Sequence, residues 1–250
     1  VYELIPIFGG RAFRLAQHLA RLERSLAAIG IPQPLQPEAW AALIARLVAV
    51  EATPSQSIYI QITRGVAPRN HLPPTGLTPT VFALATPLTP VAPETTVTAV
   101  LREDFRWARC DIKSISLLAN VLLRQEAAAA GTYEALLVRD GLITEGAASN
   151  VFVVTDGRIR TPPLSKHLLP GVTRDLIVEL LAATSDAVLE VDITRADLLS
   201  ADEIWLTSSG RELAAVSHVD GVPVGHVCPG PVYRRVAGRY AAFKASVRVE

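Results

Sequence analysis

The chain has 250 residues, half of them hydrophobic, which is enough for one large domain or two of moderate size with ample cores. No apolar run reaches the roughly 18 residues of a membrane span, no signal peptide opens the chain, and two cysteines make no disulfide framework. Because 24 acidic residues balance 24 basic ones and no basic block occurs, we expect a globular cytoplasmic protein with neither membrane nor nucleic-acid partners.

The first part of the chain predicts two helices and several strands. Residues 2–8 form a short apolar run closed by two glycines, which indicates a strand and a turn. Over residues 13–30, leucines recur at spacings of three and four, as on one face of an amphipathic helix. Residues 57–64 alternate between isoleucines and other side chains, which is typical of a half-buried strand. The other predicted elements of this part are a helix over residues 37–50 and a strand over residues 80–85.

Three closely spaced prolines within residues 87–94 make the best linker candidate of the chain. We therefore predict a small N-terminal α/β domain over residues 1–86 and a large domain over residues 95–250. The sequence contains no methionine, not even at position 1, so we expect the natural start of the small domain to lie upstream of Val1.

The large domain alternates between strand and helix patterns. Thr194 and Asp197 have the spacing of a capping box at the start of a short helix. Since no G-x-G-x-x-G motif occurs, we expect an α+β fold rather than a Rossmann domain. The predicted strands cover residues 95–101, 150–154 and 204–207, and further strands flank glycine turns near residues 140, 156 and 220. The predicted helices cover residues 116–130, about 170 to 183, and 231 onward.

Lysine is rare in this chain, which draws attention to each of the three: Lys113, Lys166 and Lys244. An unprotonated lysine amine attacks an aldehyde to form a Schiff base, and arginine cannot. Lys113 and Glu145 lie near the two ends of residues 109–150, each at the margin of an apolar run. A carboxylate facing a pyridine nitrogen keeps it protonated, so that the ring withdraws electrons. Taken alone, such a pair is more typical of a surface lysine and a turn glutamate.

Two segments offer backbone amides and hydroxyls to a phosphate. Residues 171–173, Gly-Val-Thr, begin a predicted helix, and residues 208–210, Ser-Ser-Gly, end a predicted strand. Arg21 would complete such a site from the first helix. The alternatives are an ordinary helix cap, an ordinary turn and a solvated helix arginine.

The loop over residues 64–71 gathers two arginines and a histidine without a nearby carboxylate. A guanidinium grips a carboxylate with two hydrogen bonds and an imidazole adds a third donor, although a solvent-facing loop has the same composition. The histidines elsewhere show no metal-ligand spacing, so no metal site is predicted. No G-x-S-x-G motif occurs and no cysteine has a persuasive histidine partner, which disfavours a serine or cysteine hydrolase.

Six segments occur in the order found in class IV aminotransferases, which are pyridoxal 5'-phosphate enzymes of fold type IV. The R-G-x-x-P-R-x-H pattern makes the resemblance to D-amino acid (D-alanine) transaminases the nearest. It implies a small α/β domain, a larger pseudo-barrel β domain with flanking helices, and a homodimer with shared active sites. The six segments are H-L-A-R-L, R-G-V-A-P-R-N-H, R-C-D-I-K-S, E-G-A-A-S-N-V-F, L-P-G-V-T-R-D and T-S-S.

The resemblance also implies a role for individual residues. Lys113 would be the Schiff-base lysine and proton shuttle, Glu145 would pair with the pyridine nitrogen, and Leu169 would pack near the cofactor ring. The residues that would hold the phosphate are Arg21, Val172, Thr173, Ser208 and Ser209. The residues that would hold the substrate α-carboxylate, with the loop donated by the neighbouring subunit, are Tyr2, Arg69 and His71.

The implied reaction exchanges an amino group between D-alanine or D-glutamate and a 2-oxo acid such as 2-oxoglutarate or pyruvate. Three alternatives stay open: a branched-chain or amine transaminase, an aminodeoxychorismate lyase of the same fold, and a dimeric scaffold without activity. The sequence departs from the family in three respects. It lacks the upstream segment, it has Ala147 and Ala148 where relatives often carry hydroxyls, and it has Ser209 in place of a more usual threonine.

Overall fold

The computed structural model describes residues 1–51, 53–89, 92 and 94–249. Three positions of the predicted linker over residues 87–94, namely 90, 91 and 93, lie outside the described residues. The chain divides into two compact units. The first comprises Val1–Pro90, Ile112–Ile115 and Val247–Glu250, and the second comprises Val91–Asp111 and Ser116–Ser246.

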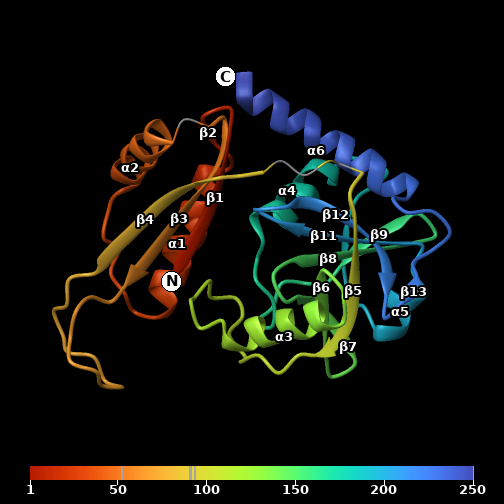
Figure 1. The fold of residues 1–250 in the computed structure, drawn as a ribbon, viewed down its shortest axis with the longest axis horizontal. Helices are drawn as coiled ribbons and strands as arrows, with labels where there is room; N and C mark the ends of the chain where they lie inside the picture. Colours follow the sequence, from red (N-terminus) through yellow and green to blue (C-terminus); the bar gives the residue numbers. More distant parts are fainter. Residues whose placement is uncertain (52, 90–91, 93, 250) are drawn as a thin grey trace. The chain divides into compact units, whose positions relative to one another are not determined.

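The first unit is an antiparallel sheet of order β2-β1-β3-β4, whose one face is covered by two helices (Figure 1). The core that joins them contains Leu22 and Trp40 from the helices and Ile5, Ile58 and Ile60 from the sheet. The predicted alternation over residues 57–64 is confirmed, since its isoleucines are buried under the helices. The elements are β1 (Tyr2–Phe8), β2 (Arg11–Ala12), α1 (Leu15–Ala28), α2 (Pro37–Val50), β3 (Ser55–Thr63) and β4 (Thr80–Pro87).

The second unit is a mixed sheet of order β10-β9-β8-β11-β12-β5-β6-β7, with β13 paired to β12. Its strands are β5 (Thr96–Glu103), β6 (Glu134–Arg139), β7 (Leu142–Gly146), β8 (Asn150–Thr155), β9 (Arg158–Thr161), β10 (Leu189–Glu190), β11 (Glu203–Ser208), β12 (Glu212–Val219) and β13 (Val222–Pro223). Its helices are α3 (Leu118–Ala129), α4 (Val172–Leu181), α5 (Arg195–Leu199) and α6 (Pro231–Val249). No helix in the described part of the chain is long and apolar enough to cross a membrane.

The sheet of the second unit curls on itself. Strand β7 lies at one edge of the hydrogen-bonded order, yet residues 147–149 alone connect it to β8, which lies well inside that order. A three-residue connection spans only about 10–14 Å, so the edge must bend back toward β8. The mixture of curled sheet and helices confirms the predicted α+β class.

The two faces of the curled sheet are unlike. Val151 and Val153 of β8 point into an apolar core with Leu206 of β11. Their neighbours Asn150 and Phe152 face the other way, because successive side chains of a strand alternate between faces. Across β8 and β11, Asn150 lies opposite Thr207, and Phe152 lies opposite Trp205 with the rings stacked at 5.6 Å.

Candidate active site

Glu145 of β7 is the most completely held of the predicted site residues. Its side chain is almost fully buried. One carboxylate oxygen accepts a hydrogen bond from Arg106 Nη1 at 2.5 Å, and the other accepts from Asn150 Nδ2 at 3.1 Å and the Leu169 amide at 3.0 Å. Burial raises the pKa of Glu145 to about 7, against the lowering effects of the Arg106 charge and these hydrogen bonds. The carboxyl group therefore titrates near neutrality.

Arg106 links Glu145 to a second buried acid, Asp104. Its Nε and Nη2 atoms donate to the two Asp104 oxygens at 2.9 Å, and Nη2 also donates to a backbone carbonyl. Arg139 Nη2 lies 3.2 Å from the Asp104 oxygen that Arg106 Nε also contacts. Burial would raise the pKa of Asp104, but the hydrogen bonds and charge of Arg106 hold it below its ordinary value. The result is a buried row of alternating charges that ends at Glu145.

The start of α4 brings backbone amides to the face of the sheet that carries Asn150. The first amides of a helix have no partner within it, and the dipole favours an anion there. The N-cap is Gly171, whose added Cβ would lie 1.9 Å from Asn150 Oδ1. Val172 and Thr173 follow it and are both buried. The helix start is thus fixed against the same asparagine that binds Glu145.

Thr207 lies beside these groups and was not predicted. Its side chain is 2% exposed, and its hydroxyl has no hydrogen-bond partner among the described residues. An unsatisfied buried hydroxyl is costly, so such an atom commonly marks a ligand contact. The next residue, Ser208, accepts a hydrogen bond from the Arg211 amide at 3.2 Å within the hairpin loop, while the predicted Ser209 and Leu169 are half-buried.

In the first unit, residues of β1 and α1 fix the backbone of Lys113. The Tyr2 amide donates to the Lys113 carbonyl at 3.0 Å, and the Lys113 amide donates to Ser25 Oγ at 3.2 Å. The lysine amine lies 4.3 Å from the centre of the Tyr2 ring. Two of the predicted residues, Tyr2 and Lys113, are therefore in direct contact.

Arg21 is not the solvated helix arginine that the sequence left open. It is 2% exposed and donates to both oxygens of buried Glu3 at 2.7 and 2.8 Å. His18, one turn earlier in α1, also lies 2.8 Å from Glu3 through Nδ1. Burial would raise the pKa of Glu3, but Arg21 and His18 hold it far below its ordinary value. The acid thus stays ionised and orients the guanidinium.

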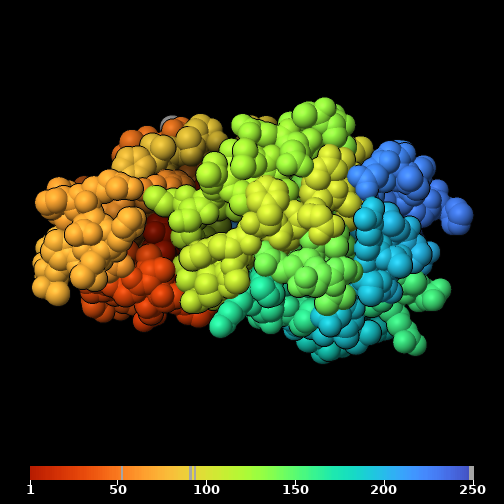
Figure 2. Space-filling model, turned by 90° about the horizontal axis from the view of Figure 1, so that it is seen from below, coloured from red at the N-terminus to blue at the C-terminus, as the bar shows by residue number. Residues whose placement is uncertain are grey.

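The cationic loop over residues 64–71 divides into two parts. Arg64 donates to the carbonyls of Ile29 and Gly30 just after α1, so it has a structural role. Arg69 and His71 are exposed on the loop of the first unit (Figure 2, orange). Their predicted role in binding the substrate carboxylate remains a proposal.

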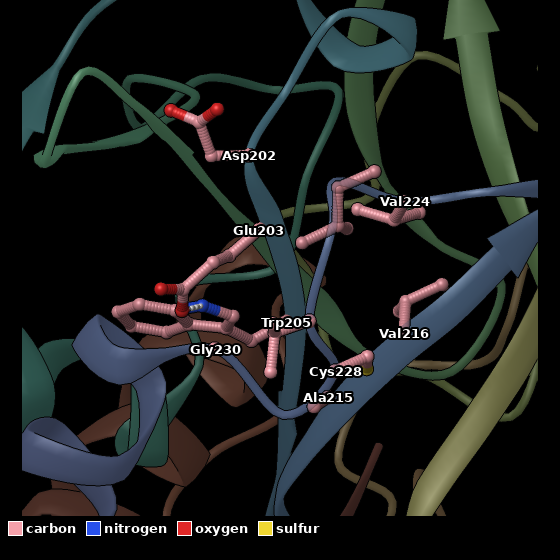
Figure 3. Close-up of a pocket in the computed structure, with 10 residues that line it drawn as sticks. Asp202, Glu203, Trp205, Ala215, Val216, Val224, Cys228 and Gly230 are labelled. Carbon is pink, nitrogen blue, oxygen red and sulfur yellow. Dashed lines mark hydrogen bonds between the residues drawn. The ribbon is translucent and has the colours of Figure 1, made fainter.

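A small pocket in the second unit holds another buried acid, Glu203 (Figure 3). Its carboxylate accepts from the Val232 and Tyr233 amides at 2.8 and 2.7 Å and from the Trp205 indole at 3.2 Å. An acid at the first turn of a helix satisfies its amides and its dipole. Glu203 therefore holds the start of α6, and no catalytic role is assigned to this pocket.

Sequence patterns did not indicate the side chains that orient the predicted ones, Glu3, Asp104, Arg106 and Asn150, nor the unsatisfied hydroxyl of Thr207. Each is ordinary in its local context, so spacing alone carried little signal. An Asp-x-Arg pair at the end of an apolar strand was the one available hint for Asp104 and Arg106.

Comparisons with known proteins point to one family. A family model described as amino-transferase class IV matches residues 1–219. The chain is 40% identical over 238 residues to a D-alanine aminotransferase of Bacillus licheniformis, covering 94% of this chain and 84% of that protein.

Two solved structures extend the comparison to the fold. The branched-chain amino acid aminotransferase of Escherichia coli has a TM-score of 0.87 at 27% identity, covering 97% of this chain and 84% of that one. The PLP-bound form of a hypothetical aminotransferase from Mycobacterium tuberculosis has a TM-score of 0.82 at 25% identity, covering 95% and 87%.

Proposed function

Since this chain belongs to the class IV aminotransferases, we propose that it moves an amino group between a D-amino acid and a 2-oxo acid, using pyridoxal 5'-phosphate. D-alanine and D-glutamate are the proposed donors, and pyruvate and 2-oxoglutarate are their products. The observation that carries the proposal is the buried carboxylate of Glu145, held by three donors and titrating near neutrality.

The residues present suit this cofactor. A phosphate needs amide and hydroxyl donors, and the start of α4 together with the unsatisfied Thr207 hydroxyl supplies both. A pyridine nitrogen needs a carboxylate, which Glu145 supplies. We assign the phosphate to Val172, Thr173, Ser208, Ser209 and Arg21, with the Thr207 hydroxyl as a further donor, and place Leu169 near the ring.

When bound, pyridoxal phosphate supplies an aldehyde for amines and a ring that withdraws electrons from the substrate α-carbon. Glu145 would hold a proton on the ring nitrogen, which would strengthen that withdrawal. The Lys113 amine would hold the cofactor and would move the proton of the substrate α-carbon. Proton transfer by a positioned base contributes about 10²–10⁴-fold to the rate.

The choice of D-substrates depends on where the substrate carboxylate is held. We assign that carboxylate to Tyr2 and, from the loop of a neighbouring subunit, to Arg69 and His71. A guanidinium and an imidazole together fix both position and orientation of a carboxylate. The face of the α-carbon that meets the Lys113 amine follows from that orientation. The proposed assembly is therefore a homodimer.

The test presents three substrates separately to protein loaded with pyridoxal phosphate: D-alanine, L-leucine and aminodeoxychorismate. Absorbance reports conversion of the bound cofactor to its aminated form, and product analysis reports the keto acid. Conversion by D-alanine with release of pyruvate supports the proposal. Conversion only by L-leucine, or pyruvate formed only from aminodeoxychorismate, would replace it with the corresponding alternative.

A further inference from the structure

Glu134, the first residue of β6, is a buried acid that the proposed mechanism does not use. Its side chain is 2% exposed. One oxygen accepts from the Ala135 amide at 3.0 Å and from Arg124 Nη1 at 3.1 Å, and the other accepts from Ser149 Oγ at 2.9 Å and the Ala148 amide at 3.3 Å. Every contact is thus to a donor, and two of the four come from the turn over residues 147–149.

That turn connects the two residues that define the proposed ring-nitrogen contact. On one side of the turn, Gly146 alone separates it from Glu145. On the other side, Asn150, which donates a hydrogen bond to Glu145, follows the turn directly. The turn also has bonds of its own. Its first carbonyl, that of Ala147, accepts from Asn120 at 2.7 Å, and the Ala147 amide donates to a neighbouring strand at 2.9 Å. A displaced turn would therefore move an acid and its donor together.

Glu134 and the turn are in tight contact. A Cβ added to Gly146 would lie 2.3 Å from Ser149 Oγ and 3.1 Å from Glu134 Cγ. Distances of this kind leave no room for a side chain at Gly146 without displacing the serine or the acid. The alanines at positions 147 and 148 carry no polar side-chain atoms, so Ser149 is the turn's only side-chain link to the acid.

We propose that Glu134 is a positioning residue: it fixes the turn over residues 147–149 and thereby sets the Glu145 carboxylate against the ring nitrogen of the cofactor. The inference rests on the proposed function. It adds a residue that acts through Glu145 and does not itself touch the cofactor. A glutamine at position 134 keeps the shape but has one acceptor oxygen in place of two and no negative charge. In either orientation of the amide, two of the four donors face an NH2 group, and the hydrogen bonds to the remaining oxygen lose the strength that the charge gives them.

The test measures dissociation constants of apoprotein for two ligands: pyridoxal phosphate and its 1-deaza analogue, in which a C–H replaces the ring nitrogen. Wild-type protein should prefer the natural ligand. Glu134→Gln should weaken binding of pyridoxal phosphate by about tenfold or more, the size typical of a lost supporting carboxylate. Binding of the analogue should change by less than about threefold, since it lacks the nitrogen through which Glu134 acts.

Two further variants complete the design. Glu126→Gln removes an exposed carboxylate from α3 whose ion pair is with the partly exposed Arg102, and it should leave both constants unchanged. Ser149→Ala removes one donor and should reproduce the ligand-dependent loss at smaller size, even if Glu134→Gln does not fold. Equal losses for both ligands, or no loss for either, would overturn the inference. Wild-type protein that binds neither ligand would instead overturn the proposed function.

Discussion

Arg106 contacts two buried carboxylates, Asp104 and Glu145, and its charge decides how both of them titrate. Removing one member of a buried ionic group leaves the others buried without compensation. The Arg106 guanidinium therefore compensates the burial of both carboxylates in this part of the second unit.

Arg106→Gln should destabilise the protein by about 3–5 kcal/mol, the usual cost of breaking a buried pair. Without the cation, the pKa values of Asp104 and Glu145 rise, so the loss should be larger at pH 8 than at pH 5. Urea unfolding at both pH values measures it. Arg109→Gln, which removes an exposed pair with Asp111, is the matched control and should change little. Equal stability of Arg106→Gln and wild type at pH 8 would contradict the account.

Glu145 itself should make the apoprotein less stable as pH rises. Its pKa is raised from an ordinary 4.5 to about 7, so the folded state holds its proton more tightly than the unfolded state. The contribution of protonated Glu145 to the free energy of unfolding is fully present below about pH 4.5. It disappears as pH rises through about 7, a change on the order of 3 kcal/mol.

The measurement compares the pH dependence of unfolding free energy for wild type and Glu145→Gln between pH 4.5 and 8. The variant does not titrate at this position, so its curve should be flatter over that range. Parallel curves would mean that Glu145 is already ionised throughout.

Among the elements, α4 shows how a helix start is fixed. The Gly-Val-Thr segment over residues 171–173 predicted the start of this helix, which is confirmed, and the capping box of Thr194 and Asp197 that begins α5 is confirmed as well. Both helix starts involve residues within four positions of each other, so the sequence pattern alone predicts them. The contact of Gly171 with Asn150 joins residues 21 positions apart on different elements, so no local pattern indicates it.

Gly171→Ala should therefore disturb the site without straining the backbone, because the φ of Gly171 is −75°. The added methyl would displace Asn150, which then loses its bonds to Glu145 and to the Leu169 carbonyl. Overpacking of this kind costs about 1–3 kcal/mol. The midpoint temperature of thermal unfolding and the affinity for the cofactor should both fall.

Gly238→Ala is the control, since an added Cβ there meets nothing within 4 Å. It lies inside α6, where alanine is favoured by about 0.8–1 kcal/mol over glycine. A Gly171→Ala protein that behaves like this control would show that Asn150 has room to move.

At the scale of the whole molecule, the sequence displayed the order of elements and the family segments but not the buried partners of the predicted residues. Arg21 illustrates the difference. Its position on α1 was evident, but its ion pair with Glu3 depends on β1 packing against that helix. Such pairs arise from tertiary structure, which one sequence does not display. The two-domain boundary and the shared active sites remain predictions.

Complementation tests the proposed homodimer with shared sites. Lys113→Ala and Arg69→Ala chains, each expected to have little activity alone, would be co-expressed with different tags and purified as mixed dimers. If the loop serves the neighbouring subunit, one site of each mixed dimer has both residues intact, which gives about half the wild-type activity. If each chain uses its own loop, the mixed dimer should be as inactive as its parents.

The most direct measurement of the central claim is reductive trapping with borohydride of protein loaded with pyridoxal phosphate, followed by peptide mapping. Lys244 is paired with Glu212 at 2.6 and 2.8 Å and Lys166 is exposed, whereas Lys113 is half-buried against Tyr2. The account predicts one cofactor per chain, attached to Lys113. Attachment to Lys166 or Lys244 with none on Lys113 would contradict it.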